Sequence, residues 1–173
     1  MALIPLVYYS YHSALHKTGA LVTVFDDALK QLVRDMIETM YHEKGVGLAA
    51  PQLGISKQIA VIDVSDEYNQ PFCIINPTII EKTGLEMMEA GCLSVPGTYD
   101  SVPRATKVKV RAQNENGEFF EIEAEGLLSH CLQHEIDHLF GKVYIDYLSP
   151  LKKKMRLKQM EKVLKAKKQR DKK

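Results

Sequence analysis

The sequence predicts one α+β domain in which short, mainly antiparallel strands pack around a central helix. Its 173 residues are enough for a single domain with a buried core. A hydrophobic content of 45% and a charged content of 26% are typical of globular proteins. The β-branched segments are grouped between helical segments instead of alternating with them, which favours α+β over a parallel α/β sheet.

Three segments have the apolar periodicity of helices. The first begins near Asp26, a suitable N-cap, and should stop before Gly45, with apolar residues at three- and four-residue steps. The second covers residues 127–140 and should end at Gly141. The third extends from about residue 150 to 169, with a lysine-rich face.

Four short segments between the first two helices carry strand signals. Residues 58–64, 71–75, 107–112 and 119–124 are rich in β-branched residues and partly alternate between apolar and polar. Residues 114–117, Asn-Glu-Asn-Gly, predict a hairpin turn between the last two strands.

Charge divides the chain into two parts. Residues 150–173 contain 12 of the 23 lysines and arginines but only 2 of the 22 acidic residues. The formal charge is therefore about −9 in residues 1–149 and about +10 in the rest. We predict a catalytic domain, residues 1–149, followed by a basic helical extension, residues 150–173. Such an extension is either a solvated helix or a surface that meets a polyanion.

The composition also indicates the cellular compartment of the protein and the redox state of its cysteines. No segment approaches the roughly 18 consecutive apolar residues of a membrane span. The N-terminus has no basic leader and no small-residue cleavage site, so we expect no signal peptide and a cytoplasmic protein. Three cysteines at wide spacing, Cys73, Cys92 and Cys131, form no disulfide framework and predict reduced thiols.

The strongest chemical signal is His134-Glu-Ile-Asp-His138 within the second helix. Histidines four residues apart share a helix face, so both imidazoles can reach one cation. The glutamate next to the first histidine can then take a proton from a metal-bound water. Because the surrounding segment is largely apolar, two surface histidines are the weaker interpretation. The motif predicts a metal-binding helix at the centre of the domain.

A third ligand has to come from another segment. His130 lies on the same helix face, but it is about 12 Å from His138 along the helix axis, too far for one ion. Tyr144 stands where a metalloprotease with the longer His-x-x-Gly-x-x-His pattern would have its third histidine. Cys92 is the best placed of the cysteines, in residues 89–97, which we predict to be a loop. Cys73 and Cys131 fall in apolar segments and are more typical of a core.

Three motifs together resemble the peptide deformylase family: residues 45–52 (Gly-Val-Gly-Leu-Ala-Ala-Pro-Gln), 91–94 (Gly-Cys-Leu-Ser) and 134–138. The resemblance extends from about residue 25 to 151. It implies removal of the N-terminal formyl group from new formyl-methionyl chains, with release of formate. It further implies that Cys92, His134 and His138 bind the ion, with water as the fourth ligand. Glu135 would be the general base and then the acid, and Gln52 and the backbone N–H of Leu93 would stabilise the oxyanion.

The resemblance also implies a substrate pocket, an ion and partners. The residues expected to contact the methionyl chain are Val46, Gly47, Met88, Leu127, His130 and Cys131. The family prefers Fe2+, and Zn2+, Ni2+ or Co2+ can occupy the same site. Since the substrate emerges from the ribosome and rRNA is a polyanion, the basic helix is a candidate for ribosome contact. We expect a monomer with no membrane partner.

Two places depart from the family pattern: the N-terminal stretch, which lacks the usual Pro-Asp-containing turn near Tyr9, and the position before Gly91. Ala90 replaces the usual acidic residue before Gly91, a carboxylate that we expect to brace the cysteine segment through Arg104. Two other classes of protein remain as alternatives. A metalloprotease is disfavoured by the absence of the third histidine. A non-catalytic RNA-binding protein would explain the basic end of the chain but not the glutamine, cysteine, glutamate and histidines.

Overall fold

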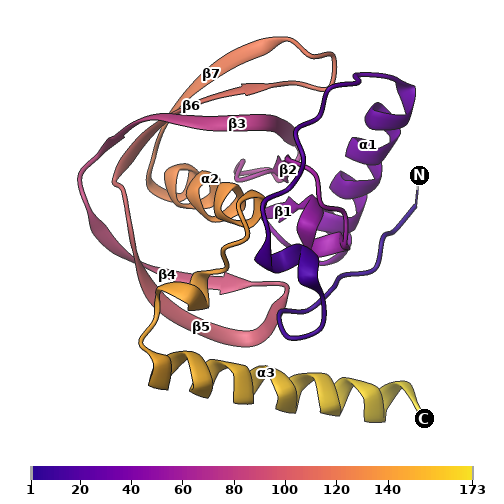
Figure 1. Ribbon diagram of the computed structural model, residues 1–173, viewed down its shortest axis with the longest axis vertical. Coiled ribbons are helices and arrows are strands. Elements are labelled where there is room, and N and C mark those ends of the chain that lie inside the picture. Colours follow the sequence, from indigo (N-terminus) through magenta and orange to yellow (C-terminus); the bar gives the residue numbers. More distant parts are fainter. Residues whose placement is uncertain (1, 173) are drawn as a thin grey trace.

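Helix α2 (Gly126–Leu139) lies between two antiparallel sheets in the computed structural model, which describes residues 2–172 (Figure 1). On one side is a five-stranded sheet, and on the other a two-stranded hairpin. The large sheet has the order β1 (Gly47–Ala49), β2 (Ile59–Ile62), β3 (Phe72–Thr83), β6 (Lys107–Gln113) and β7 (Phe119–Glu125). The hairpin consists of β4 (Glu86–Cys92) and β5 (Val95–Arg104).

The apolar residues of α2 face the large sheet. Cys131, Leu132, Ile136 and Leu139 are buried against residues of β2, β3, β6 and β7. Helix α1 (Asp27–His42) packs on the other face of β1 and β2 with Val33, Met36 and Met40. The helix with the histidine motif is therefore the central element of the protein. The predicted α+β fold is confirmed.

The predicted helices agree with the structure to within one or two residues. Asp26 caps α1, its carboxylate accepting a hydrogen bond from the N–H of Leu29 at 3.0 Å. Helix α3 (Pro150–Asp171) starts at a proline, whose missing N–H costs nothing in the first turn. The turn at residues 114–117 is present, and Gly117 there has a φ of 82°.

The strand prediction was incomplete. All four predicted strands are present, but β3 extends to Thr83, and β1, β4 and β5 were missed. The prediction of a loop for residues 89–97 was wrong, because Cys92 ends β4 and Val95 begins β5. Glycines and prolines in this hairpin concealed its strands. A register shift between Ala90 and Cys92 shows that the pairing is irregular there, which a sequence pattern does not reveal.

Helix α3 packs along the outer side of the hairpin (Figure 1). Met160 is completely buried in a cluster that contains Val95, Val102 and Tyr144. A Cβ atom on Gly97 would lie 2.4 Å from Cγ2 of Val163, so helix and hairpin touch closely. Within residues 2–172, no helix has both the length and the apolar character needed to cross a bilayer.

The packing of α3 can be tested at Met160. We expect Met160→Ala to lower the free energy of unfolding by roughly 2–5 kcal/mol, because it leaves a cavity between α3 and the hairpin. Met155 on the same helix is 46% exposed, so Met155→Ala should change it by less than about 0.5 kcal/mol. Urea unfolding of both variants measures the difference. Equal effects would mean that α3 contributes little to the folded body.

Candidate metal centre

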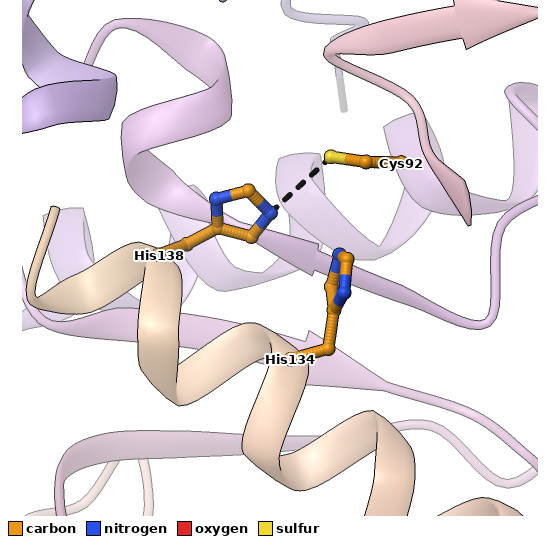
Figure 2. A group of neighbouring side chains, drawn as sticks. All are labelled: Cys92, His134 and His138. Atoms are coloured by element: carbon orange, nitrogen blue, oxygen red, sulfur yellow. Dashed lines mark hydrogen bonds between the residues drawn. The ribbon is translucent and has the colours of Figure 1, made fainter. Parts of the chain in front are cut away.

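Cys92, His134 and His138 converge on one point between α2 and the β4–β5 hairpin (Figure 2). One potential ligand atom from each residue lies within 4.8 Å of the others. Sγ of Cys92 is 3.3 Å from Nε2 of His138, and the two imidazole rings have centroids 4.9 Å apart. Such a set of one sulfur and two nitrogens could hold a divalent ion and leave one position of a tetrahedral site for water or substrate.

Local structure explains why these three side chains meet. His134 and His138 are one turn apart on α2, so their side chains leave the same face of the helix (Figure 2). Cys92 is the last residue of β4, next to the turn made by Leu93 and Ser94. A short turn at the tip of a paired hairpin holds the thiol more firmly than a free loop would.

The electrostatics of the three side chains fit a cation. Burial lowers the pKa of His138 to about 3, and it lowers that of His134 well below the ordinary value. Both imidazoles are therefore neutral and offer lone pairs. Burial raises the pKa of the Cys92 thiol to about 12, so a thiolate here requires a positive partner. Nδ1 of His138 is buried without a hydrogen-bond partner among the described residues.

Glu135 is buried beside the ligands. Its carboxylate is 2% exposed, and Oε1 has no hydrogen-bond partner within residues 2–172. Burial raises the pKa of Glu135 to about 8, although Arg104 opposes part of that rise. A buried carboxyl group that can exchange a proton near neutral pH is typical of general acid–base catalysis.

Two further predicted residues flank the same point. Gln52 is 1% exposed in the short 3-10 helix Ala50–Leu53. Its Oε1 accepts a hydrogen bond from the N–H of Ala49 at 2.9 Å, which directs Nε2 toward Sγ of Cys92 at 3.5 Å. Leu93 follows Cys92 directly in the turn. Both residues line the cleft that opens over Glu135 and His134.

The cleft has a volume of about 480 Å³ and contains most of the predicted substrate-binding residues. Val46, Gly47, His130 and Cys131 line it. Oxygen of Val46 accepts hydrogen bonds from the N–H of Asp63 at 2.8 Å and from the thiol of Cys131 at 3.7 Å. These bonds fix the edge of the cleft that β1 provides.

The substrate contacts predicted for Met88 and Leu127 stay predictions. Met88, in the middle of β4, and Leu127, which is 53% exposed in the first turn of α2, do not belong to the described lining of the cleft. His130 lines the cleft but is not part of the ligand cluster, as helix geometry predicts. Its pKa is lowered by burial and by Arg104.

Tyr144, at the position of a protease's third histidine, has another partner. Its hydroxyl is hydrogen-bonded to Oγ1 of Thr98, and the residue is fully buried. The ring lies beside His134, with centroids 6.5 Å apart. Tyr144 therefore packs against the metal helix, while the third side chain at the centre comes from Cys92.

The sequence did not indicate that the two ends of the chain also line the cleft. Leu6 and Tyr8 come from the N-terminal segment, and Val163, Leu164 and Lys167 come from α3. The apolar face of α3 was a signal that this helix packs on something. Its partner could be identified only when the hairpin had been placed.

Arg104 joins the hairpin to the metal helix. Its Nη1 donates to Oδ2 of Asp137 at 2.7 Å, and the side chain of Arg104 is only 3% exposed. Ala90 is buried. It lies on the same face of the hairpin as Arg104, because Arg104 pairs with Glu86, four residues before Ala90 on β4. Asp137 is therefore the carboxylate that pairs with Arg104 in this chain. Nε and Nη2 of Arg104 have no partner in the described part of the chain.

A helix with two histidines and a buried glutamate, completed by a thiol from a hairpin, defines a metal-dependent hydrolase. The profile of the polypeptide deformylase family matches residues 4–154. Peptide deformylase 1 of Burkholderia multivorans is 48% identical over 168 residues, covering 95% of this chain and 92% of the relative. The peptide deformylase of Hahella chejuensis is 55% identical over 142 residues, covering 82% and 84%.

Solved structures agree with this result. The peptide deformylase of Legionella pneumophila has a TM-score of 0.92 and 45% identity, covering 95% of this chain and 97% of its own. The Ehrlichia chaffeensis enzyme in complex with actinonin has a TM-score of 0.89 and 37% identity, covering 94% and 98%. The chain belongs to the peptide deformylase family, as its three motifs predicted.

Gly47 is where the edge of the cleft approaches the glutamate most closely. A Cβ atom there would lie 2.5 Å from Oε2 of Glu135 and 2.9 Å from Sγ of Cys131. We expect Gly47→Ala to displace Glu135 and to lower kcat/KM about 100-fold, as misplacement of a catalytic group by 1 Å does. Metal content should remain one ion per chain.

Gly45→Ala is the matched control for this variant. Its new Cβ would approach the end of the flexible Leu93 side chain at 3.1 Å and no carboxylate, so its effect on kcat/KM should be much smaller. Steady-state kinetics measure kcat/KM of both variants, and elemental analysis measures their metal content. A fully active Gly47→Ala protein would contradict the close approach.

Proposed function

We propose that this protein hydrolyses the formyl group from the N-terminus of formyl-methionyl polypeptides and releases formate. The observation that carries this proposal is the buried Glu135 beside the cluster of Cys92, His134 and His138, in a chain of the peptide deformylase family. The cleft of about 480 Å³ is of a size that holds a methionyl side chain and the first peptide groups.

Cys92, His134 and His138 would hold one divalent ion. Such an ion lowers the pKa of water and polarises a carbonyl oxygen. Ligand chemistry alone leaves the choice among Fe2+, Zn2+, Ni2+ and Co2+ open, because thiolate and imidazole suit all of them. Membership in the family favours Fe2+ in the native protein.

Glu135 is the proton carrier of the proposed reaction. It takes a proton from the attacking water as a general base and then gives it to the departing amine as an acid. Its pKa of about 8 suits both steps near neutral pH, since a group titrating close to the working pH can both accept and donate. Burial among Gly47, Cys131 and the ligands keeps bulk water from competing for the proton.

Two donors would stabilise the oxyanion that forms on the formyl oxygen when water attacks the formyl carbon. Nε2 of Gln52 is already directed at the centre, because its Oε1 is held by the N–H of Ala49. The backbone N–H of Leu93 is the second proposed donor. Fixed donors of this kind contribute about 3 kcal/mol each to stabilising the transition state.

Val46, Gly47, His130 and Cys131 are the proposed contacts of the methionyl group, since all four line the cleft. Gly47 lets the substrate backbone approach β1 because it has no side chain. Met88 and Leu127 stay predicted contacts of the methionyl chain, although neither belongs to the described lining of the cleft. His130 adds a polar edge to an otherwise largely apolar pocket.

Deformylation can be tested directly. Protein loaded with Fe2+ or Ni2+ without oxygen should release formate from a short formyl-methionyl peptide. Glu135→Ala should lower kcat/KM by about 100- to 10,000-fold, because a positioned acid–base group contributes that much, and should keep its metal. No turnover by fully metallated wild-type protein would overturn the proposal.

Metal content separates the role of the glutamate from the role of the ligands. Cys92→Ala should lose the ion, whereas Cys73→Ala should keep it, because Cys73 is buried in β3 and its thiol bonds to Glu115 at 3.1 Å. Elemental analysis measures both. Equal metal content in the two variants would remove Cys92 from the proposed ligands.

We further propose that α3 contacts the ribosome, where formylated chains emerge in the cytoplasm. The outward side of the helix is rich in exposed lysines, and rRNA is a dense polyanion. Removal of α3 would be an unsuitable test, because Met160 and Leu164 belong to the packed body. Charge substitutions leave that packing intact.

The double variant Lys154→Glu, Lys158→Glu should co-sediment with ribosomes more weakly and with a smaller salt dependence, since fewer counterions are released on binding. Both lysines are exposed on α3. The double variant Lys57→Glu, Lys82→Glu makes the same charge change on exposed lysines of the main body and should bind as wild type. Unaltered co-sedimentation of the α3 variant would refute ribosome contact through α3.

A further inference from the structure

The catalytic cleft continues into a second cavity. This cavity has a volume of about 630 Å³ and lies between the N-terminal segment and α3. Tyr8, Leu164 and Lys167 line both the cleft and this cavity, so the two spaces adjoin at these residues. We call the second cavity, bounded by Tyr8 and Tyr11 on one side and by the C-terminal half of α3 on the other, the tyrosine–lysine groove.

The N-terminal wall of the groove is fixed to the catalytic site. The N–H of Val7 donates to the backbone oxygen of Gln52 at 2.8 Å, and the N–H of Tyr9 donates to that of Ser94 at 3.0 Å. Tyr11 hydroxyl bonds to the carboxylate of Glu161 on α3 at 2.7 Å. The wall therefore keeps its position when a substrate arrives, and a preformed groove loses little entropy on binding.

Positive charge dominates the groove. Lys162, Lys165, Lys167 and Lys168 line it, against only Glu161 and Asp171. The Glu161 carboxylate already accepts the hydrogen bond from Tyr11. Nζ of Lys167 lies 3.4 Å from the hydroxyl of Tyr8, which places its ammonium group where the cleft and the groove meet.

We propose that the tyrosine–lysine groove binds the residues that follow methionine in the formylated chain and favours acidic side chains there. This inference rests on the proposed function, because it needs the formyl end of the chain at Glu135. An extended peptide advances about 3.3 Å per residue, so a few residues carry it from the cleft into the groove. The tyrosine rings offer apolar contact to any sequence, and the lysines add the preference for negative charge.

A different path would lead past Lys44, which also lines the cleft but lies beyond the end of α1, next to Glu43. The opposite charge of Glu43 leaves that edge without a net preference. The two paths can be distinguished experimentally, because only a peptide in the groove would place its charged side chains near Lys167.

The test compares two formylated peptides of equal length, formyl-Met-Ala-Ser followed by three aspartates or by three lysines. Wild-type holoprotein should have a kcat/KM about three- to fivefold higher for the aspartate peptide, the range expected for exposed charge pairs. The difference should appear mainly in KM and shrink in high salt, where the screening length falls to about 3 Å at 1 M.

Three charge reversals locate the effect. Lys167→Glu should lower the ratio of kcat/KM for the aspartate peptide to kcat/KM for the lysine peptide to one or below. Lys158→Glu makes the same charge change on α3 but outside the groove, and it should keep the wild-type ratio. If both variants changed the ratio equally, the preference would come from the overall charge of α3 and not from the groove. If only Lys44→Glu changed it, the peptide would instead follow the path past Lys44. Either result would overturn the proposal, as would a wild-type ratio of one.

Equilibrium binding separates this inference from the catalytic one. The same two peptides, carrying a dye at the C-terminus, are titrated with metal-loaded Glu135→Gln protein and followed by fluorescence anisotropy. The aspartate peptide should bind about three- to fivefold more tightly, and Lys167→Glu should abolish the difference. If no formylated peptide is hydrolysed by wild type, the proposed function fails, while the anisotropy still decides whether the groove prefers acidic chains. Equal affinities would overturn the groove proposal even in an active enzyme.

Discussion

The ion pair between Arg104 and Asp137 joins the two parts of the protein between which the site forms. Arg104 belongs to β5 and Asp137 to α2, and their 2.7 Å contact is largely removed from solvent. Loss of one partner of a buried pair costs about 3–5 kcal/mol, because the other charge is left unpaired. Asp137 directly precedes His138, and Arg104 is in the same hairpin as Cys92. The pair therefore connects the hairpin that carries the thiol to the helix that carries the imidazoles.

Burial determines the chemistry of everything around that pair. The same exclusion of water keeps the histidines neutral, raises the pKa of the Cys92 thiol to about 12 and raises that of Glu135 to about 8. A divalent cation would compensate the cost of a buried thiolate while leaving Glu135 free to exchange a proton. The cluster thus combines a strong requirement for an ion with a carboxyl group ready for proton transfer.

The rim of the cleft is assembled from segments that are far apart in the chain. The N-terminal segment donates backbone hydrogen bonds to the backbone oxygens of Gln52 and Ser94, and α3 packs on the hairpin through Met160 and Val163. Residues from both ends of the chain consequently border the cleft. The basic helix α3 thereby brings positive charge to the mouth of the cleft through Lys167.

Periodicity and motif spacing were sufficient to predict the helices, the candidate ligands on α2 and the family. Helical periodicity and the spacing of His134 and His138 are local properties, and geometry along one helix was enough to separate His130 from the ligand set. Only the tertiary structure decided the rest. The β4–β5 hairpin was missed because its pairing is irregular at Ala90 and Cys92, and pairing energy comes from a partner strand. The partner of Arg104 and the contribution of α3 to the wall of the cleft both depend on packing between distant segments, which no local pattern encodes.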